Sequence, residues 1–135
     1  MAATDFFVDL LTSAVQPHEI LKSIRVPLTA KTVAYVRFTQ KASGFAIAGA
    51  AVVLDKARKA AAVAVTGVAA KAYRASGVES SLRGVELSPE TIAAAAQKAA
   101  DGIDPLSDIH TSAEFRAHLA RVHAKRALEL AANRG

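Results

Sequence analysis

The amino-acid sequence predicts an α+β fold, in which a three- to four-stranded antiparallel sheet is packed on one face by a three-helix layer. Two observations support this prediction. Segments with the alternation and branched residues of strands fill the first half of the chain, and segments with helix caps follow Gly67. Strands first and helices second is an order typical of α+β domains. The chain has 135 residues, of which 52% are hydrophobic, and this is enough for one compact domain with an alanine-rich core.

Four segments are expected to be strands: residues 19–27, 32–40, 45–54 and 60–68. The first segment ends at Pro27, which cannot donate to a ladder. The second segment alternates, which puts Arg37 on the face opposite Val36 and Phe38. Periodicity alone leaves a short buried helix open for the third segment. The hairpin-sized break "DKARK" between the third and fourth segments favours two strands.

Three segments are expected to be helices: residues 69–84, 88–102 and 111–135. The first ends on Gly84, a residue type common just beyond a helix. The second has Ser88 at its N-cap, followed by a proline, and ends before a glycine. The third starts at the capping-box spacing of Thr111 and Glu114. Its apolar face is expected to hold Phe115, Leu119, Val122 and Leu130.

Composition and charge exclude several classes of protein. Because the chain has no cysteine, disulfides, thiolate zinc sites and cysteine-ligated iron–sulfur clusters are excluded. The net charge is +5 and the isoelectric point about 9.8, but the basic residues are scattered, so no nucleic-acid partner is expected. No apolar run approaches the roughly 20 residues of a transmembrane segment. Acidic residues stand where a signal peptide would carry lysine or arginine, so a cytoplasmic location is expected.

No self-contained catalytic or metal site is predicted. The helical pair His118 and His123 is five residues apart, so the two do not share a face, and the histidines are expected to be exposed or to cap helices. Asp108 and its acidic neighbours lack calcium-loop spacing and are interpreted as turn or cap residues. The stretch "QKASGFAIAG", residues 40–49, has the outline of a glycine-rich phosphate loop, but no Gly-Lys-Ser/Thr follows it.

Three segments together resemble a known family. They are "DFFVDLLTSAVQPHEILKSIRVP", "AYVRFTQKASGFAIAGAAVVL" and "DPLSDIHTSAEFRAHLARVHAKRAL". They are similar to the C-terminal domain of the FAD-binding medium subunit of molybdenum hydroxylases, the family of xanthine dehydrogenase and carbon monoxide dehydrogenase. The most specific match is the helix entry Ser-Asp-x-x-x-Ser-Ala-Glu-Phe-Arg of the third segment. One departure is Ala72–Tyr73 before Arg74, where the family usually carries a proline.

The resemblance implies a domain division and a set of partners. Residues 1–30 would be a remnant of the preceding flavin-domain tail, and residues 31–135 a carbon monoxide dehydrogenase flavoprotein C-terminal-like domain. The glycine-rich loops that hold the FAD pyrophosphate lie in the family's N-terminal half, which this sequence lacks. FAD binding is therefore expected only with a chain that supplies that half. The other implied partners are a large subunit with the molybdenum cofactor and a small subunit with [2Fe-2S] clusters.

The resemblance also implies a site. It places Arg37, Lys41 and Phe45 beside the flavin as cofactor-binding residues, Phe45 next to the isoalloxazine ring, and it implies no catalytic residue in this chain. The implied function is one wall of the flavin site and the interface through which electrons pass from iron–sulfur clusters to FAD and an acceptor. The alternative to flavin contact is that Phe45 is plain core and Arg37 is solvated. The alternative function is an orphaned protein-interaction or assembly module without redox activity.

Overall fold

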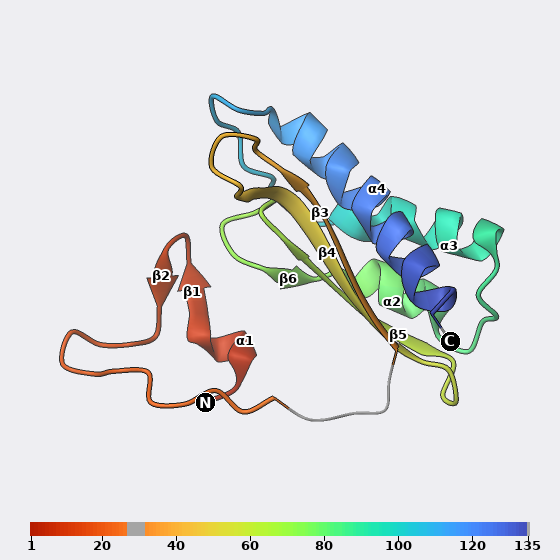
Figure 1. Cartoon of the computed structure of the whole chain (residues 1–135), viewed down its shortest axis with the longest axis horizontal. Coiled ribbons are helices and arrows are strands. Elements are labelled where there is room, and N and C mark those ends of the chain that lie inside the picture. Colours follow the sequence, from red (N-terminus) through yellow and green to blue (C-terminus); the bar gives the residue numbers. More distant parts are fainter. Residues whose placement is uncertain (27–31, 135) are drawn as a thin grey trace.

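The structure, a computed structural model, describes residues 1–26 and 32–134 and has at its centre a four-stranded antiparallel sheet (Figure 1). The strands lie in the order β3-β4-β5-β6 and comprise β3 Thr32–Thr39, β4 Ala46–Asp55, β5 Ala60–Thr66 and β6 Tyr73–Arg74. The main helices are α2 Ser76–Leu82, α3 Pro89–Ala96, the 3₁₀ turn η1 Gln97–Ala100, and α4 Ala113–Ala132. The predicted α+β class and antiparallel sheet are confirmed.

The helices cover one face of this sheet, as predicted. Helix α4 packs across β3 and β4, while α2 packs against β5 and α3 packs against both α2 and α4 (Figure 1). The inward positions of β4 alternate along the strand: Ala48, Ala50, Val52 and Leu54 are all at most 2% exposed. They meet the alanine-rich face of α4, so the two elements approach closely with few large side chains.

The other face of the sheet carries no such helix layer. The antiparallel register aligns Tyr35 with Ala51 and Arg37 with Gly49, and these positions alternate with the buried ones. Val33 and Tyr35 are 54% and 49% exposed. We call this side the open face, defined by Val33, Tyr35, Arg37, Gly49, Ala51, Val53, Ala62, Ala64 and Thr66.

The helix predicted over residues 69–84 is wrong in its first half. Residues 73–74 form β6, which pairs with β5 through Val65 and Tyr73, and only Ser76–Leu82 is helical. Two tertiary bonds hold this segment in place: the Ala75 N–H donates to the Val63 carbonyl at 2.8 Å, and Tyr73 Oη donates to the Ala99 carbonyl at 3.0 Å. Pairing with a sheet edge has overridden local helix propensity.

Helix α4 begins one residue later than predicted, and its buried face is as predicted at Leu119 but not at Phe115. Its N-cap is Ser112, whose Oγ accepts from the Phe115 N–H at 3.3 Å, whereas the backbone N–H of Thr111 is held by Asp108. Phe115 is 45% exposed, although it was expected on the apolar face. The buried stripe instead contains Arg116, Leu119, Ala120, His123, Ala124, Ala127, Leu128 and Ala131. The Ser88 cap of α3 is confirmed, with Thr91 completing a capping box.

The N-terminal segment, residues 1–26, stands apart from this domain (Figure 1). It holds the short helix α1 Ala3–Phe6 and a two-stranded sheet of β1 Phe7–Asp9 and β2 Thr12–Ser13. The strand predicted at 19–27 is absent from residues 19–26, and Pro27 lies outside the described residues. These residues have no neighbouring strand to pair with, and Ile20 and Ile24 are 88% and 76% exposed. Within the described part of the chain, no helix has the length and hydropathy that crossing a bilayer requires.

Candidate functional site

The stretch "QKASGF" is a closed hairpin turn between β3 and β4. The Gln40 N–H donates to the Phe45 carbonyl at 2.9 Å, and the Gly44 N–H donates back to the Gln40 carbonyl at 2.9 Å. The Gln40 side chain accepts from the Ser43 N–H at 2.7 Å. Gly44 has φ +73°, a left-handed conformation that the turn requires. Because these N–H groups bond within the turn, the loop is not a phosphate cradle.

The three predicted site residues all lie on this hairpin, at one end of the sheet. Arg37 is exposed on the open face of β3, and Lys41 is exposed in the turn. Phe45 ends the turn with 78% of its surface exposed. Among the described residues, neither Arg37 nor Lys41 makes an ion pair within 4 Å. The interpretation of Phe45 as plain core does not fit this exposure, whereas a solvated Arg37 does.

Sequence reasoning did not single out Tyr35, which lies next to Arg37's position on the open face. A Cβ atom on Gly49 would lie 2.6 Å from Tyr35 Oη and 3.1 Å from the ring carbon that carries it. Because Gly49 has no side chain, the Tyr35 ring can lie directly against the backbone of β4 at that position. A glycine in the middle of an apolar strand is the signal that pointed to such an approach.

A buried arginine fixes the same end of the sheet from the helix side. Arg116 is 6% exposed, and its Nη1 donates to the carbonyls of Ile47, at 2.9 Å, and Gly67. Its Nη2 donates to Asp108 Oδ2 at 2.6 Å. One guanidinium thus ties together the start of β4, the end of β5 and the loop that precedes α4. The Ser-Asp-x-x-x-Ser-Ala-Glu-Phe-Arg motif is explained by this bond set, because its Asp and Arg are the two ends of the ion pair.

Asp108 is held by the turn that it starts. Its Oδ1 accepts from the backbone N–H groups of His110 at 2.9 Å and Thr111 at 3.1 Å. The His110 N–H is the main cause that lowers the pKa of the Asp108 carboxyl, and the Arg116 charge lowers it further. The prediction that Asp108 acts as a turn or cap residue is borne out by these bonds.

The histidines differ from the prediction at one position. His18, His110 and His118 are exposed, but His123 is 2% exposed, with Nδ1 placed 2.8 Å from the Leu119 carbonyl. Its ring meets Phe38 edge-on at 6.3 Å. Because the Leu119 carbonyl, one helical turn earlier, provides a hydrogen-bond partner for Nδ1, the His123 ring can be buried on the packed face of α4. In the described residues, no three His, Cys, Asp or Glu side chains group as metal ligands would.

The hairpin has the chemistry to meet a flat anionic ring and lacks the chemistry to hold a pyrophosphate. An exposed aromatic side chain can stack on a planar ring, and two cations near it favour negative charge there. A pyrophosphate needs converging free N–H groups. The N–H groups of Gln40, Ser43, Gly44 and Phe45 are bonded within the hairpin, and side chains cap α3 and α4. The residues therefore fit the isoalloxazine part of FAD and not its phosphates.

Comparison with known proteins places this domain in a family. The family model described as "CO dehydrogenase flavoprotein C-terminal domain" matches residues 33–131. The chain is 33% identical over 117 residues to the nicotine 6-hydroxylase medium subunit of Paenarthrobacter nicotinovorans, covering 84% of this chain and 41% of that relative. It is 32% identical over 134 residues to the carbon monoxide dehydrogenase medium chain of Hydrogenophaga pseudoflava, covering 96% of this chain and 47% of that one.

Solved structures agree with this assignment. Quinoline 2-oxidoreductase from Pseudomonas putida 86 superposes with a TM-score of 0.89 at 28% identity, over 98% of this chain and 48% of that one. The chain thus belongs to the CO dehydrogenase flavoprotein C-terminal domain family, the C-terminal domain of the FAD-binding subunit of molybdenum hydroxylases. It spans less than half the length of the relatives that it matches.

Proposed function

We propose that this chain forms one wall of the flavin site in the FAD subunit of a molybdenum-containing hydroxylase or dehydrogenase. The observation that carries the proposal is Phe45, a large aromatic side chain that is 78% exposed at the tip of the β3–β4 hairpin. Such exposure has a reason if the ring of a cofactor covers it. The flavin-binding half, which the relatives' greater length accommodates, would hold the FAD phosphates.

The roles of the other two residues follow from charge and position. Arg37 is exposed on the open face and Lys41 is exposed in the turn. Both side chains can therefore lie near the flavin without any change in the backbone of the sheet. A fixed positive charge there favours the reduced, anionic flavin. The Arg116 bonds hold the start of β4, and this would keep the hairpin rigid when the flavin-binding half packs against it.

The partners and the electron path belong to the same proposal. A large subunit would carry the molybdenum cofactor, a small subunit would carry the [2Fe-2S] clusters, and a further chain would supply the FAD-binding half. This domain would lie at their interface, where electrons pass from the clusters to FAD and then to an acceptor. Family membership and the charges of the hairpin support this arrangement.

The test uses the complex reconstituted with the flavin-binding half. Phe45→Ala removes a stacking contact of about 0.5–1.5 kcal/mol and is expected to lower FAD occupancy. Arg37→Gln is expected to lower the flavin reduction potential by tens of millivolts, since about 30 mV corresponds to 1.4 kcal/mol for two electrons. Lys125→Gln, on the exposed side of α4, is the matched control. His123 cannot serve as a control because it is buried.

If Phe45→Ala and Arg37→Gln both fold and both keep the wild-type FAD occupancy and flavin reduction potential, the proposal of a flavin wall is contradicted. The alternative, an interaction module without redox activity, is favoured by one observation. The N-terminal segment exposes several large apolar side chains, which any protein partner could cover. That alternative predicts that the partner complex contains no FAD, so the absorbance spectrum of the complex separates the two.

A further inference from the structure

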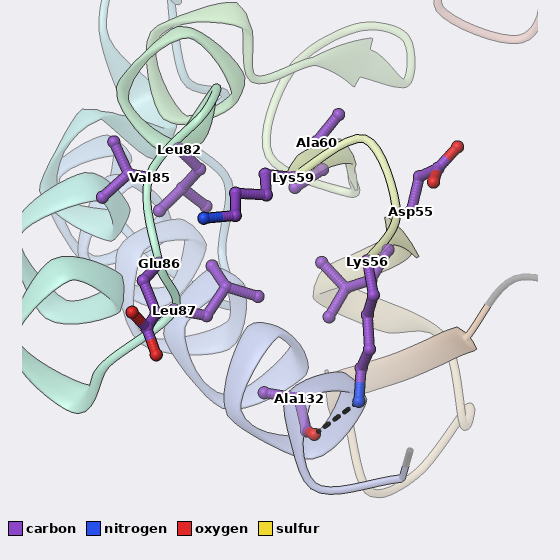
Figure 2. A pocket seen from close by; sticks show the side chains of 11 residues that line it. Asp55, Lys56, Lys59, Ala60, Leu82, Val85, Glu86, Leu87 and Ala132 are labelled. Carbon is purple, nitrogen blue, oxygen red and sulfur yellow. Dashed lines mark hydrogen bonds between the residues drawn. The ribbon is translucent and has the colours of Figure 1, made fainter.

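A cavity of about 380 Å³ opens at the end of the sheet far from the Phe45 hairpin. It lies between the β4–β5 turn, the loop after α2 and the C-terminal end of α4 (Figure 2). This volume falls in the range of small-molecule sites. The proposed flavin wall does not use this end of the molecule, and no function described above depends on it.

Hydrogen bonds join the walls of the cavity, so it is formed before any ligand arrives. The Gly84 N–H donates to the Lys59 carbonyl at 2.8 Å, linking the loop after α2 to the β4–β5 turn. Lys56 Nζ donates to the Ala132 carbonyl at 3.4 Å, linking the same turn to the end of α4 (Figure 2). A preformed site binds without the cost of ordering its walls.

The floor of the cavity is apolar and its rim is charged. Leu54 and Leu82, only 2% and 1% exposed, lie beneath the cavity, and its accessible apolar surface comes from Val85, 40% exposed, and the half-buried Leu87. Lys59 extends across this floor toward Leu82 and Val85 (Figure 2). Lys59 has φ +45°, a conformation that a glycine or asparagine usually occupies. This conformation belongs to the β4–β5 turn, which the Lys59 N–H closes by donating to the Lys56 carbonyl at 3.3 Å.

The charges at the rim leave Lys59 available. Asp55 Oδ1 accepts from the Arg58 N–H at 3.1 Å, its Oδ2 pairs with the Arg58 side chain at 3.9 Å, and its carboxylate is turned away from the cavity (Figure 2). The Glu86 carboxylate is also directed away from both lysines (Figure 2). Among the described residues, the Lys59 ammonium has no hydrogen bond or ion pair, whereas that of Lys56 is bound to Ala132.

We propose that this cavity is a binding site for a small carboxylate with an alkyl body. The carboxylate would accept from Lys59 Nζ, and the apolar body would lie on Val85 and Leu87, the lining side chains whose apolar surface a ligand can reach. A charge-assisted hydrogen bond together with buried apolar surface is the combination that such a ligand needs. An anionic ligand is favoured over a cationic one because the unpaired group over the floor is an ammonium.

The test titrates the full chain with octanoate and follows backbone amides by two-dimensional NMR. Saturable shifts are expected at Lys59, Gly84 and Leu87. Heptylammonium, which has the same heptyl chain and the opposite charge, is expected to produce none there. Lys59→Gln is expected to weaken octanoate binding about tenfold, the effect of losing one charge-assisted hydrogen bond. Lys125→Gln, on the exposed side of α4 and outside the cavity lining, is the matched control and is expected to bind as wild type.

Three results would overturn the proposal. If octanol binds as tightly as octanoate, the cavity binds apolar molecules without selecting for a negative charge. Unchanged octanoate affinity in Lys59→Gln, with the remaining amide signals intact, would remove the lysine from the site. Non-saturating shifts spread over residues 1–26 would show only adsorption to the exposed apolar segment. Because the site lies away from the Phe45 hairpin, none of these results bears on the flavin wall.

Discussion

Arg116 is the polar residue on which this domain depends most. It is 6% exposed and bonds two backbone carbonyls and one carboxylate. Removing one partner of a buried ion pair costs about 3–5 kcal/mol, because the remaining groups stay buried and unpaired. Asp108 is 44% exposed and can be rehydrated, so the lower end of that range applies here.

We therefore expect Arg116→Met to lower the free energy of unfolding by about 3 kcal/mol. Methionine keeps much of the aliphatic volume, so the loss measures the bonds and not a cavity. Urea denaturation of the variant and wild type gives the difference. Lys125→Met, which removes an exposed pair with Glu129 at 3.7 Å, is expected to change stability by less than about 0.5 kcal/mol. Equal stability of the two variants would contradict the role of Arg116.

Tyr73 provides a prediction on pH dependence. Burial raises the pKa of the Tyr73 phenol to about 12, from an ordinary value of 10.0, and the Arg121 charge partly opposes this. The neutral phenol is therefore favoured in the folded state. Its contribution to stability is fully present below pH 10.0 and is lost as the pH rises through about 12.

The ultraviolet titration of tyrosinate, measured as wild type minus Tyr73→Phe, reports this residue alone. We expect a midpoint near pH 12. A midpoint near 10.0 would mean that the phenol is solvated and does not bond to Ala99 in solution. At neutral pH, the same substitution removes one hydrogen bond and is expected to cost about 1 kcal/mol.

At the scale of the element, the sequence was most informative where local signals and tertiary packing agree. The alternation of residues 32–40 predicted β3 and assigned its two faces correctly. Ser88 and Pro89 predicted the start of α3, and the capping box is present. Both signals lie within a few residues of one another, so no distant contact was needed to read them.

The errors fall where a distant partner decides the structure. Residues 73–74 form a strand because they pair with the edge of β5 at Val65. The residues around positions 73–74 do not by themselves indicate this pairing. His123 was expected to be exposed because a histidine on a helix usually is, but the stripe that it occupies packs against β3 and β4. For the candidate site, the sequence indicated Arg37, Lys41 and Phe45 only through family resemblance, and it missed both Tyr35 and the cavity at Lys59.

Two glycines with similar backbone angles offer a matched test of packing at element ends. Gly67 has φ +78°, and a Cβ there would lie 2.6 Å from the Ala46 carbonyl oxygen and 2.8 Å from that of Ile47. Gly84 has φ +73° with nothing within 4 Å. We expect Gly84→Ala to cost about 1–2 kcal/mol, the penalty of the left-handed conformation alone.

Gly67→Ala carries the same penalty and must also move backbone atoms that Arg116 holds. We expect its loss to exceed that of Gly84→Ala by at least about 1 kcal/mol, because rigid interiors resist overpacking. Thermal or urea unfolding of the two variants gives the comparison. If the two variants lose equal amounts of stability, the start of β4 and the end of β5 move freely to accommodate the extra methyl group, and the close packing at Gly67 is contradicted.

At the scale of the whole molecule, the helices cover one face of the sheet, whereas the open face and residues 1–26 are exposed. The large apolar side chains of residues 1–26 are strongly exposed, with Leu11 at 101% and Ile20 at 88%. A hydrogen bond from Lys71 Nζ to the Phe7 carbonyl, 3.3 Å, joins this segment to the domain. Exposed apolar surface of this extent marks an interaction site, and the chain spans less than half of its relatives. If the proposed function is correct, the N-terminal segment and the open face are the surfaces that we expect a flavin-binding half to cover.

This arrangement leads to a prediction about the isolated chain and the complex. Alone, the purified chain is expected to be colourless, because residues 1–26 and 32–134 offer no cradle for the FAD pyrophosphate. Its residues 1–26 are expected to exchange amide hydrogens rapidly, since few of their N–H groups are bonded and their side chains are exposed. Residues 46–66, in the central strands, are expected to exchange slowly in both states.

Addition of the flavin-binding half, with FAD, is expected to slow exchange in residues 1–26 and at the β3–β4 turn, and to leave the turn at Lys59 unchanged. Hydrogen exchange followed by mass spectrometry measures all three regions in one experiment, so the Lys59 turn serves as an internal control. A yellow chain with stoichiometric FAD after gel filtration alone would show that the other half is not needed for flavin binding. Protection at the Lys59 turn in place of the N-terminal segment would mean that the partner docks at the opposite end of the sheet. Either outcome would contradict the assignment of the open face and the N-terminal segment as the surface that the flavin-binding half covers.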